Sequence, residues 1–187
     1  MRKTIALALL TLLIGCNEVV GVPLEADAAC NLVEKDNLQP ILATPVAFEV
    51  TQVDNFERRK SGLGSRCKVL FVDLPAPKTF AEQFKQPSIV LSLYNPDSYA
   101  AGNKLREEKG NGTSLDFNQH WDRISGNQAV EEMGRGQGFV RETAVGSLKE
   151  IQGILRVGDL LVVVSAANLS PDTVKQVLNH ISEQGKF

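Results

Sequence analysis

The sequence GILRVGDLLVVVSAA, residues 153–167, decides the fold of this chain. Its second half carries no charge after Asp159 and is β-branched at its centre, so it predicts a strand that is buried on both faces. Its first half is another apolar run, and Gly158 stands at the first position of a two-residue loop, as a type II′ hairpin turn requires. Residues 154–167 therefore predict a β-hairpin at the centre of a sheet.

A helix is expected directly after this hairpin. Ser170 is a suitable N-cap residue, and Pro171 occupies the first helical position, where proline is favoured. Four apolar residues then recur at the i, i+3, i+4 and i+7 spacing of one helix face: Val174, Val177, Leu178 and Ile181. This stripe can pack on the hairpin, and Gly185 is placed to end the helix.

Other patterns along the chain predict further strands and helices. Strands are expected at residues 47–53, 66–74 and 89–94, with two short strands around a glycine-rich bend at 129–140. Helices are expected at residues 31–42, where Pro40 must bend the helix or mark its start, and at 96–108. The sequence thus predicts a single α+β domain, residues 30–187, with a largely antiparallel sheet of five to seven strands flanked by helices.

The first sixteen residues are organised like an export signal. Arg2 and Lys3 are basic, and Ile5 to Ile14 form an apolar segment that is interrupted by Thr11. A helix of this length spans about 15 Å, whereas the hydrocarbon core of a membrane is about 30 Å thick. The segment therefore predicts a cleaved signal peptide rather than a membrane anchor.

Leu13-Ile14-Gly15-Cys16 resembles the bacterial lipobox, in which the peptidase cuts before the cysteine and the thiol receives diacylglycerol. The resemblance implies a signal peptide at residues 1–15, a lipidated, palmitate-bearing N-terminus at Cys16 and a tether at residues 16–29. The alternative is an ordinary secretory signal cleaved at the small residues 26–28, which lie farther from the apolar segment than is usual. Residue 17 is Asn rather than Asp. In bacteria with two membranes, this difference would permit the lipoprotein to pass to the outer membrane.

The charge balance argues against binding to nucleic acid. Removal of residues 1–15 takes away Arg2 and Lys3 and leaves 18 basic against 22 acidic residues, a formal charge of −4. Such a mildly acidic chain lacks the positive field that nucleic acids require. No second apolar segment approaches the length of a membrane span, so attachment to the membrane is expected through the lipid alone.

Cys30 and Cys67 are the thiols that remain once Cys16 is lipidated. An even pair in an oxidising compartment predicts a disulfide, which in the chain-entropy model stabilises the fold by about 4 kcal/mol. A metal pair or a redox pair is the alternative, but the spacing is far from Cys-x-x-Cys and no histidine lies near either cysteine in sequence.

Fragments of enzyme motifs occur in three places. Ser65-Arg66-Cys67-Lys68 has the Ser-x-x-Lys spacing of penicillin-binding enzymes, but on a strand this spacing places the two side chains on opposite faces. Ser125-Gly126-Asn127 has the Ser-x-Asn spacing, and the third mark, Lys-Thr-Gly, is absent. Gly134 to Gly138 precede a strand rather than the helix of a nucleotide-binding loop, so a bulge or tight bend is expected. The sequence predicts no catalytic residue, no metal ligand and no cofactor.

His120, Trp121 and Asp122 form a possible partner-binding cluster within residues 113–126, a segment with no clear periodicity. A tryptophan with polar neighbours between glycines is typical of a recognition site. The same pattern is also produced when one tryptophan closes the edge of a core.

Several short motifs together resemble a known family: Cys30-Asn31-Leu32-Val33, Arg66-Cys67-x-Val69, Val130-x-x-Met133-Gly134 and Leu155-x-Val157-Gly158-Asp159-Leu160-x-Val162, followed by the closing helix. The chain resembles uncharacterised small-lipoprotein domains of bacterial envelopes, best known in actinobacteria, that are similar in fold to PsbP-like α-β-α sandwiches. The resemblance covers most of residues 30–182 and implies no catalytic residues, because that family is not defined by any. Residues 110–140 depart from the pattern, since they are richer in glycine and charge.

These observations predict a non-catalytic lipoprotein of the cell envelope. We expect it to be anchored by its lipid to a bacterial membrane, to face the periplasm, and to bind another envelope protein or a small apolar ligand. The alternative is an immunity or inhibitor lipoprotein that neutralises an envelope-directed toxin or enzyme. A hydrolase of envelope material is a third class, but the sequence offers it no assembled nucleophile and base.

Overall fold

The structure is a computed structural model that describes residues 24–53, 56–79, 82, 85–110, 112–145 and 148–184. The predicted signal peptide 1–15, the predicted lipidation site Cys16 and the part of the tether before Leu24 lie outside the described residues.

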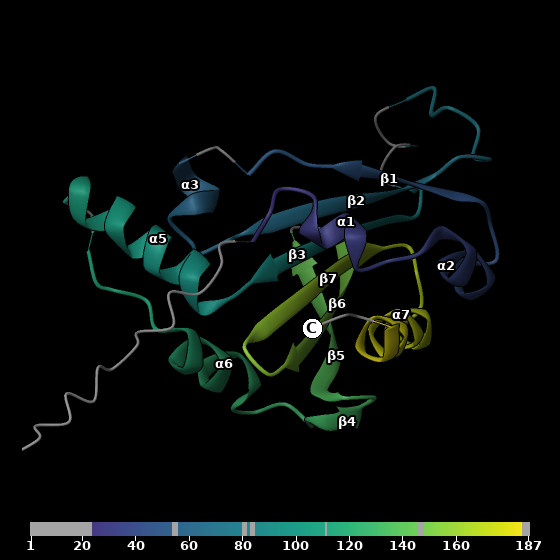
Figure 1. Ribbon diagram of the computed structural model, residues 1–187. Helices are drawn as coiled ribbons and strands as arrows, with labels where there is room; N and C mark the ends of the chain where they lie inside the picture. The colour runs from purple at the N-terminus through teal and green to yellow at the C-terminus, as the bar shows by residue number, and fades with distance from the viewer. Residues whose placement is uncertain are drawn as a thin grey trace, which may run out of the picture.

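The chain folds into one α+β domain built on a seven-stranded sheet (Figure 1). The strand order is β1-β2-β3-β7-β6-β5-β4, and every neighbouring pair is antiparallel. The strands are β1 (Val46–Val50), β2 (Ser65–Phe71), β3 (Ser88–Tyr94), β4 (Glu131–Met133), β5 (Gly136–Val145), β6 (Leu148–Val157) and β7 (Leu160–Ala167). The predicted fold class and the antiparallel sheet are confirmed.

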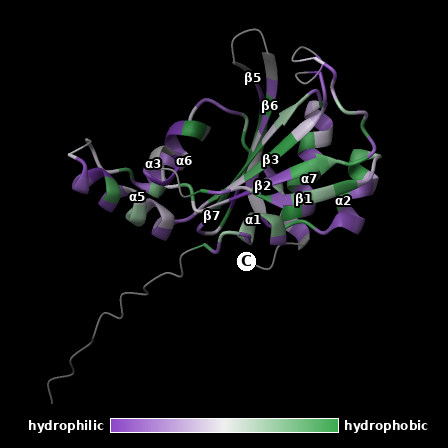
Figure 2. Ribbon diagram, turned by 90° about the horizontal axis from the view of Figure 1, so that it is seen from above, coloured by the Kyte–Doolittle hydropathy of each residue, from purple (hydrophilic) through white to green (hydrophobic). Residues whose placement is uncertain are grey.

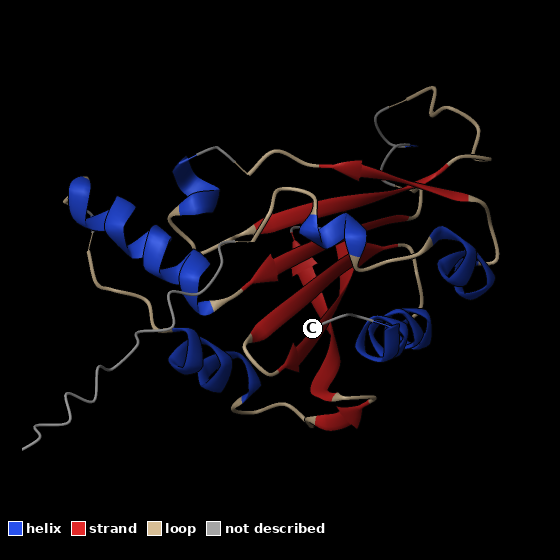
Figure 3. Ribbon diagram, in the orientation of Figure 1, coloured by secondary structure: helices blue, strands red, loops and turns tan. Residues whose placement is uncertain are grey.

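Helices cover the two faces of the sheet unequally (Figure 3). The helices given by the described residues are α1 (Ala28–Asn31), α2 (Lys35–Leu42), α3 (Phe56–Arg59), α5 (Pro96–Glu108), α6 (Phe117–Ser125) and α7 (Pro171–Gln184). Helices α1, α2 and α7 pack against one face and enclose the main core, whereas α5 and α6 lie at one end of the other face. Among the described helices, none has both the length and the apolar character needed to cross a membrane.

The predicted hairpin at residues 154–167 is confirmed as β6 and β7, and β7 is the middle strand of the sheet. The pair Val157↔Leu160 closes the ladder around a two-residue turn, in which Gly158 has a φ of 55°. Val162 and Val164 are fully buried in the main core, while Leu161 is fully buried on the opposite face. Strand β7 is therefore buried along one face, but on the other face it is fully buried only at Leu161, and Ser165 and Ala167 are half-buried. The prediction of a strand buried on both faces is wrong for the second half of β7, because no helix of the described ranges covers it there.

Helix α7 packs closely on β6 through its apolar stripe. The Ser170 hydroxyl accepts a hydrogen bond from the Thr173 amide at 3.1 Å, so Ser170 is the N-cap. Val174 and Leu178 are fully buried, and a Cβ added to Gly153 on β6 would lie 2.6 Å from a methyl carbon of Val174. Gly153 thus lets the helix approach the sheet more closely than any other residue would allow.

The prediction of one helix over residues 31–42 is wrong. The segment contains the end of α1 and then a separate helix, α2, which begins at Lys35. Between them the chain turns to bury Val33, which is 4% exposed, and Glu34 adopts an extended conformation with a ψ of 132°. Pro40 neither starts nor ends α2 but lies inside it, on its exposed side.

Strands β1 and β2 are shorter than predicted at their C-terminal ends. Each begins one residue earlier and ends three residues earlier than the ranges 47–53 and 66–74. The register sets the end of β2, because Val46, the first residue of β1, pairs with Phe71 and the chain beyond Phe71 has no neighbouring strand. Val72 is accordingly 53% exposed, although its side chain is apolar.

The predicted disulfide between Cys30 and Cys67 is confirmed. The sulfur atoms are 2.08 Å apart and the Cα atoms 5.0 Å apart, and the bond joins the end of α1 to β2. The buried Ser65 hydroxyl reinforces this junction, since it accepts from the Ala29 amide at 2.9 Å and donates to the Ala26 carbonyl at 2.9 Å. The N-terminal end of the described chain is therefore held against the sheet.

Candidate functional site

The sequence-predicted cluster His120, Trp121 and Asp122 lies on α6, a helix that the sequence analysis did not predict. Its N-cap is Asp116, whose carboxylate accepts a hydrogen bond from the Gln119 amide at 2.8 Å. Phe117 and Trp121 are four residues apart, so both point to the sheet from one side of the helix. This cap and this spacing were the available signals for the helix.

Trp121 is buried in a second core on the face of the sheet opposite α7. This second core consists of Tyr99, Phe117, Trp121, Phe139, Ile154 and Leu161. Trp121 is 8% exposed, and its ring centroid lies 6.3 Å from that of Phe139. The guanidinium of Arg156 lies 5.9 Å from the Trp121 centroid and adds a cation–π contact. The environment of Trp121 is that of a residue that closes the edge of a core.

His120 points from α6 toward two tyrosines. Its Nδ1 shares a hydrogen bond with the Tyr99 hydroxyl, and its ring centroid lies 6.5 Å from that of Tyr94. Burial, and then the positive charge of Arg123, lower the pKa of His120, while burial raises the pKa of both tyrosines. These directions keep all three groups neutral at pH 7, so the contact between His120 and Tyr99 joins two uncharged groups.

Asp122 is exposed and does not share the environment of its two neighbours. The structure therefore does not bring the three consecutive residues together on one surface. Instead, it brings His120 to Tyr94 and Tyr99, and Trp121 to Phe139.

The fragments of enzyme motifs are not assembled into a site. Ser65 is fully buried beside α1, whereas Lys68 is exposed on the other face of β2. The Ser125 hydroxyl donates to the Trp121 carbonyl at 2.8 Å within α6. Gly134, with a φ of 55°, occupies the turn between β4 and β5, as the glycine-rich sequence predicts. Among the described residues, no group of three or more His, Cys, Asp or Glu side chains is placed to hold a metal ion.

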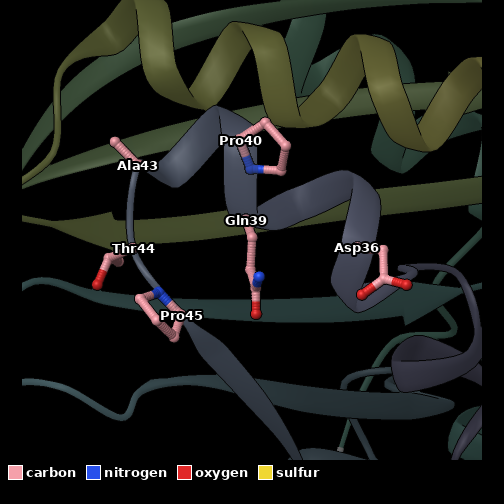
Figure 4. A pocket seen from close by; sticks show the side chains of 6 residues that line it. All are labelled: Asp36, Gln39, Pro40, Ala43, Thr44 and Pro45. Atoms are coloured by element: carbon pink, nitrogen blue, oxygen red, sulfur yellow. The ribbon is translucent and has the colours of Figure 1, made fainter.

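Two hollows of the described surface are candidates for a small ligand. The larger, of about 420 Å³, is an open depression formed by α2 and the turn into β1, and Figure 4 shows the six residues that line it: Asp36, Gln39, Pro40, Ala43, Thr44 and Pro45. The smaller, of about 180 Å³, is a crevice between Leu24, α3 and α5. Ligand pockets are typically about 300–1,000 Å³ and enclose most of the ligand. The first hollow is too open and the second too small to fit this description.

A larger feature is the part of the sheet that α5 and α6 leave uncovered, which we call the open face. One row of paired residues crosses six strands here: Glu49, Lys68, Val90, Ser165, Gln152 and Arg141. The next row contains Ala47, Leu70, Ser88, Ala167, Glu150 and Thr143. All twelve side chains are at least partly exposed, and in Figure 2 no helix of the described ranges covers this part of the sheet.

The side chains at the centre of the open face are small and weakly polar, and those at its two sides include charged ones. The central strands β3 and β7 contribute two serines, Val90 and Ala167, so a partner can approach the sheet closely. On one side of the open face, Lys68 of β2 lies opposite Glu49 of β1 in the strand register. On the other side, the Arg141 Nε donates to the Gln152 side-chain oxygen at 2.9 Å. This arrangement resembles a protein interface, which has a less charged centre and a polar rim.

Sequence reasoning missed the open face because its signal is weak. The alternation of apolar and polar residues along β3, from Ser88 to Tyr94, shows that one side of that strand is more polar. It does not show which part of that side a helix covers, because this depends on where α5 and α6 pack.

No family model, no curated protein and no solved structure matches this chain. The resemblance to small envelope lipoproteins therefore stays a prediction.

Proposed function

We propose that this protein is a lipid-anchored binding or accessory protein of the bacterial envelope, without catalytic activity, and that it binds another envelope protein through the open face. The observation that carries the binding role is the composition of the open face, with small side chains on β3 and β7 and charged side chains at both rims. The location rests on the apolar segment and on Leu13-Ile14-Gly15-Cys16.

The disulfide supports the proposed compartment. Structural disulfides persist in oxidising compartments and are rare in the reducing cytosol. Cys30 and Cys67 are joined, and Cys67 is fully buried. An exported, periplasm-facing domain is the setting in which such a bond is stable.

The dimensions of the open face favour a protein over a small ligand. Six strands at a spacing of about 4.8 Å make a surface about 24 Å across. An open surface of this width does not enclose a small molecule, but it can contact a protein, whose interface is typically about 800 Å² on each side. The partner would touch the open face and part of its surroundings.

Site-specific photocrosslinking in intact envelopes tests this proposal. A photoreactive amino acid at Val90 is expected to capture a discrete partner, whereas the same group at Gln176, exposed on α7, is not. Ser165→Arg places a long charged side chain at the centre of the open face, so it should abolish capture at Val90. Gln176→Arg is the matched control and should leave capture unchanged. Equal capture from both positions, or capture that survives Ser165→Arg, would contradict the proposal.

The identity of the captured protein separates the two roles that the sequence left open. An envelope component that is present in every culture supports the accessory role. A toxin, or an enzyme that attacks the envelope, supports the immunity role, and deletion of the lipoprotein should then be lethal only when that toxin is present.

A further inference from the structure

The place where the tether enters the domain is well defined. Leu24 is the first described residue, and its side chain packs on Gly64, where an added Cβ would lie 2.6 Å from a Leu24 methyl carbon. Leu24 also lines the crevice of about 180 Å³, together with Arg59 of α3 and Ala101 of α5. Leu24, eight positions after Cys16, therefore lies beside α3 and α5.

Basic residues gather on these two helices and on the residue that follows α3, and we call this group the basic corner. Its members are Arg58, Arg59, Lys60, Lys104 and Arg106. Residues 57–60 and 96–109 contain six basic residues against four acidic ones, whereas acidic residues outnumber basic ones in the processed chain as a whole. The corner is thus a positive region on a mildly negative molecule.

The basic corner is held rigidly. A Cβ added to Gly102 of α5 would lie 2.7 Å from the Arg59 carbonyl oxygen, so the two helices are in close contact. The Arg106 Nε donates to the Lys60 carbonyl at 2.7 Å and fixes α5 to the turn after α3. Arg59 and Lys104 are exposed, and Lys104 lies one helical turn from Ala101, which lines the crevice.

The short tether limits which side of the domain can reach the membrane. Seven residues lie between Cys16 and Leu24, so their Cα atoms are eight residue steps apart, and a fully extended chain of that length spans at most about 29 Å. A domain of this size is about 40 Å across, so the side that bears Leu24 is the side closest to the lipid anchor.

We infer that the basic corner is the surface that this domain presents to a bilayer of anionic phospholipids, with the crevice beside Leu24 at the membrane side. This inference rests on the proposed lipid anchor at Cys16. Basic side chains next to a lipid anchor are attracted to anionic headgroups within about one Debye length, so they can orient a domain that the lipid already holds at the membrane. In this orientation α2, at the other end of the molecule in Figure 1, points away from the bilayer.

The test uses the full processed lipoprotein in vesicles, with Trp121 as the energy-transfer donor and a dansyl-labelled headgroup as the acceptor. Trp121 is the single tryptophan, and α6, which carries it, lies beside α5 in Figure 1. Energy transfer should be greater in vesicles of phosphatidylcholine with phosphatidylglycerol than in phosphatidylcholine alone. It should fall to the phosphatidylcholine level in 1 M salt, where the Debye length is about 3 Å.

Two charge reversals provide the matched comparison. Arg59→Glu should remove the dependence on phosphatidylglycerol, whereas Lys35→Glu, at the start of α2, should retain it. Equal transfer on both kinds of vesicle, or an equal loss in both variants, would overturn the orientation. Flotation with phosphatidylcholine vesicles tests the anchor separately: protein that does not float lacks the lipid, which removes the proposed function and this inference with it.

Discussion

Replacement of Trp121 by alanine should destabilise the domain strongly. Trp121 is 8% exposed and contacts Phe139, and the Arg156 guanidinium covers its ring. Truncation of a buried tryptophan typically costs about 3–5 kcal/mol in the free energy of unfolding, because a cavity remains. In a domain of this size each kcal/mol lowers the melting temperature by about 2–4 °C, so we expect a decrease of about 6–20 °C.

Far-UV circular dichroism is the appropriate measurement, because the variant no longer has a tryptophan to report unfolding by fluorescence. Asp122→Ala is the control, since an exposed neighbour should change the stability by no more than about 0.5 kcal/mol. A melting temperature within 2 °C of the parent's, together with loss of partner capture, would refute the reasoning. Trp121 would then act in recognition rather than in the second core.

Three further predictions concern the cysteines and the histidines. Cys16→Ala should leave an unprocessed precursor and abolish the incorporation of radiolabelled palmitate, and undiminished labelling would remove the lipoprotein assignment. Cys67→Ser should lower the free energy of unfolding by about 2–5 kcal/mol in urea titrations, and a value near zero would mean that the bond with Cys30 contributes nothing. Burial lowers the pKa of His120 and His180 below about 6.5, so the unfolded chain binds protons first as the pH falls. Stability should be complete above pH 6.5 and decrease below it, and the double variant with asparagine at both positions should show a shallower decrease between pH 6.5 and 5.

The central hairpin and its helix could be predicted from the sequence because local and long-range requirements agree there. Gly158 supplies the turn, the apolar run after it suits a strand in the interior of the sheet, and Ser170 with Pro171 starts the helix. Each residue pattern in this unit allows one structure, so the prediction needed no knowledge of the rest of the chain.

Elsewhere the sequence was ambiguous because tertiary contacts decide the outcome. Pro40 suggested a helix boundary, but the boundary lies at Val33, which turns inward to join the main core. The segment with Trp121 looked irregular because its apolar residues recur over only a short stretch of sequence. Its helix is stabilised by contacts within the second core, which the sequence does not reveal. The open face could not be predicted at all, since it is defined by where α5 and α6 end.

The disulfide also determines how the domain would respond to a mechanical load. A pull on the proposed lipid anchor would reach the described chain at Leu24 and pass through Cys30 directly to Cys67, near the middle of β2. The intervening residues, which include α2, β1 and α3, then lie outside the path of the force and cannot be peeled from the sheet one after another. With the bond intact, the loop of 37 residues, which would span about 120–130 Å if fully extended, cannot be stretched by the pull. The edge of the sheet next to β2 would therefore remain in place under tension.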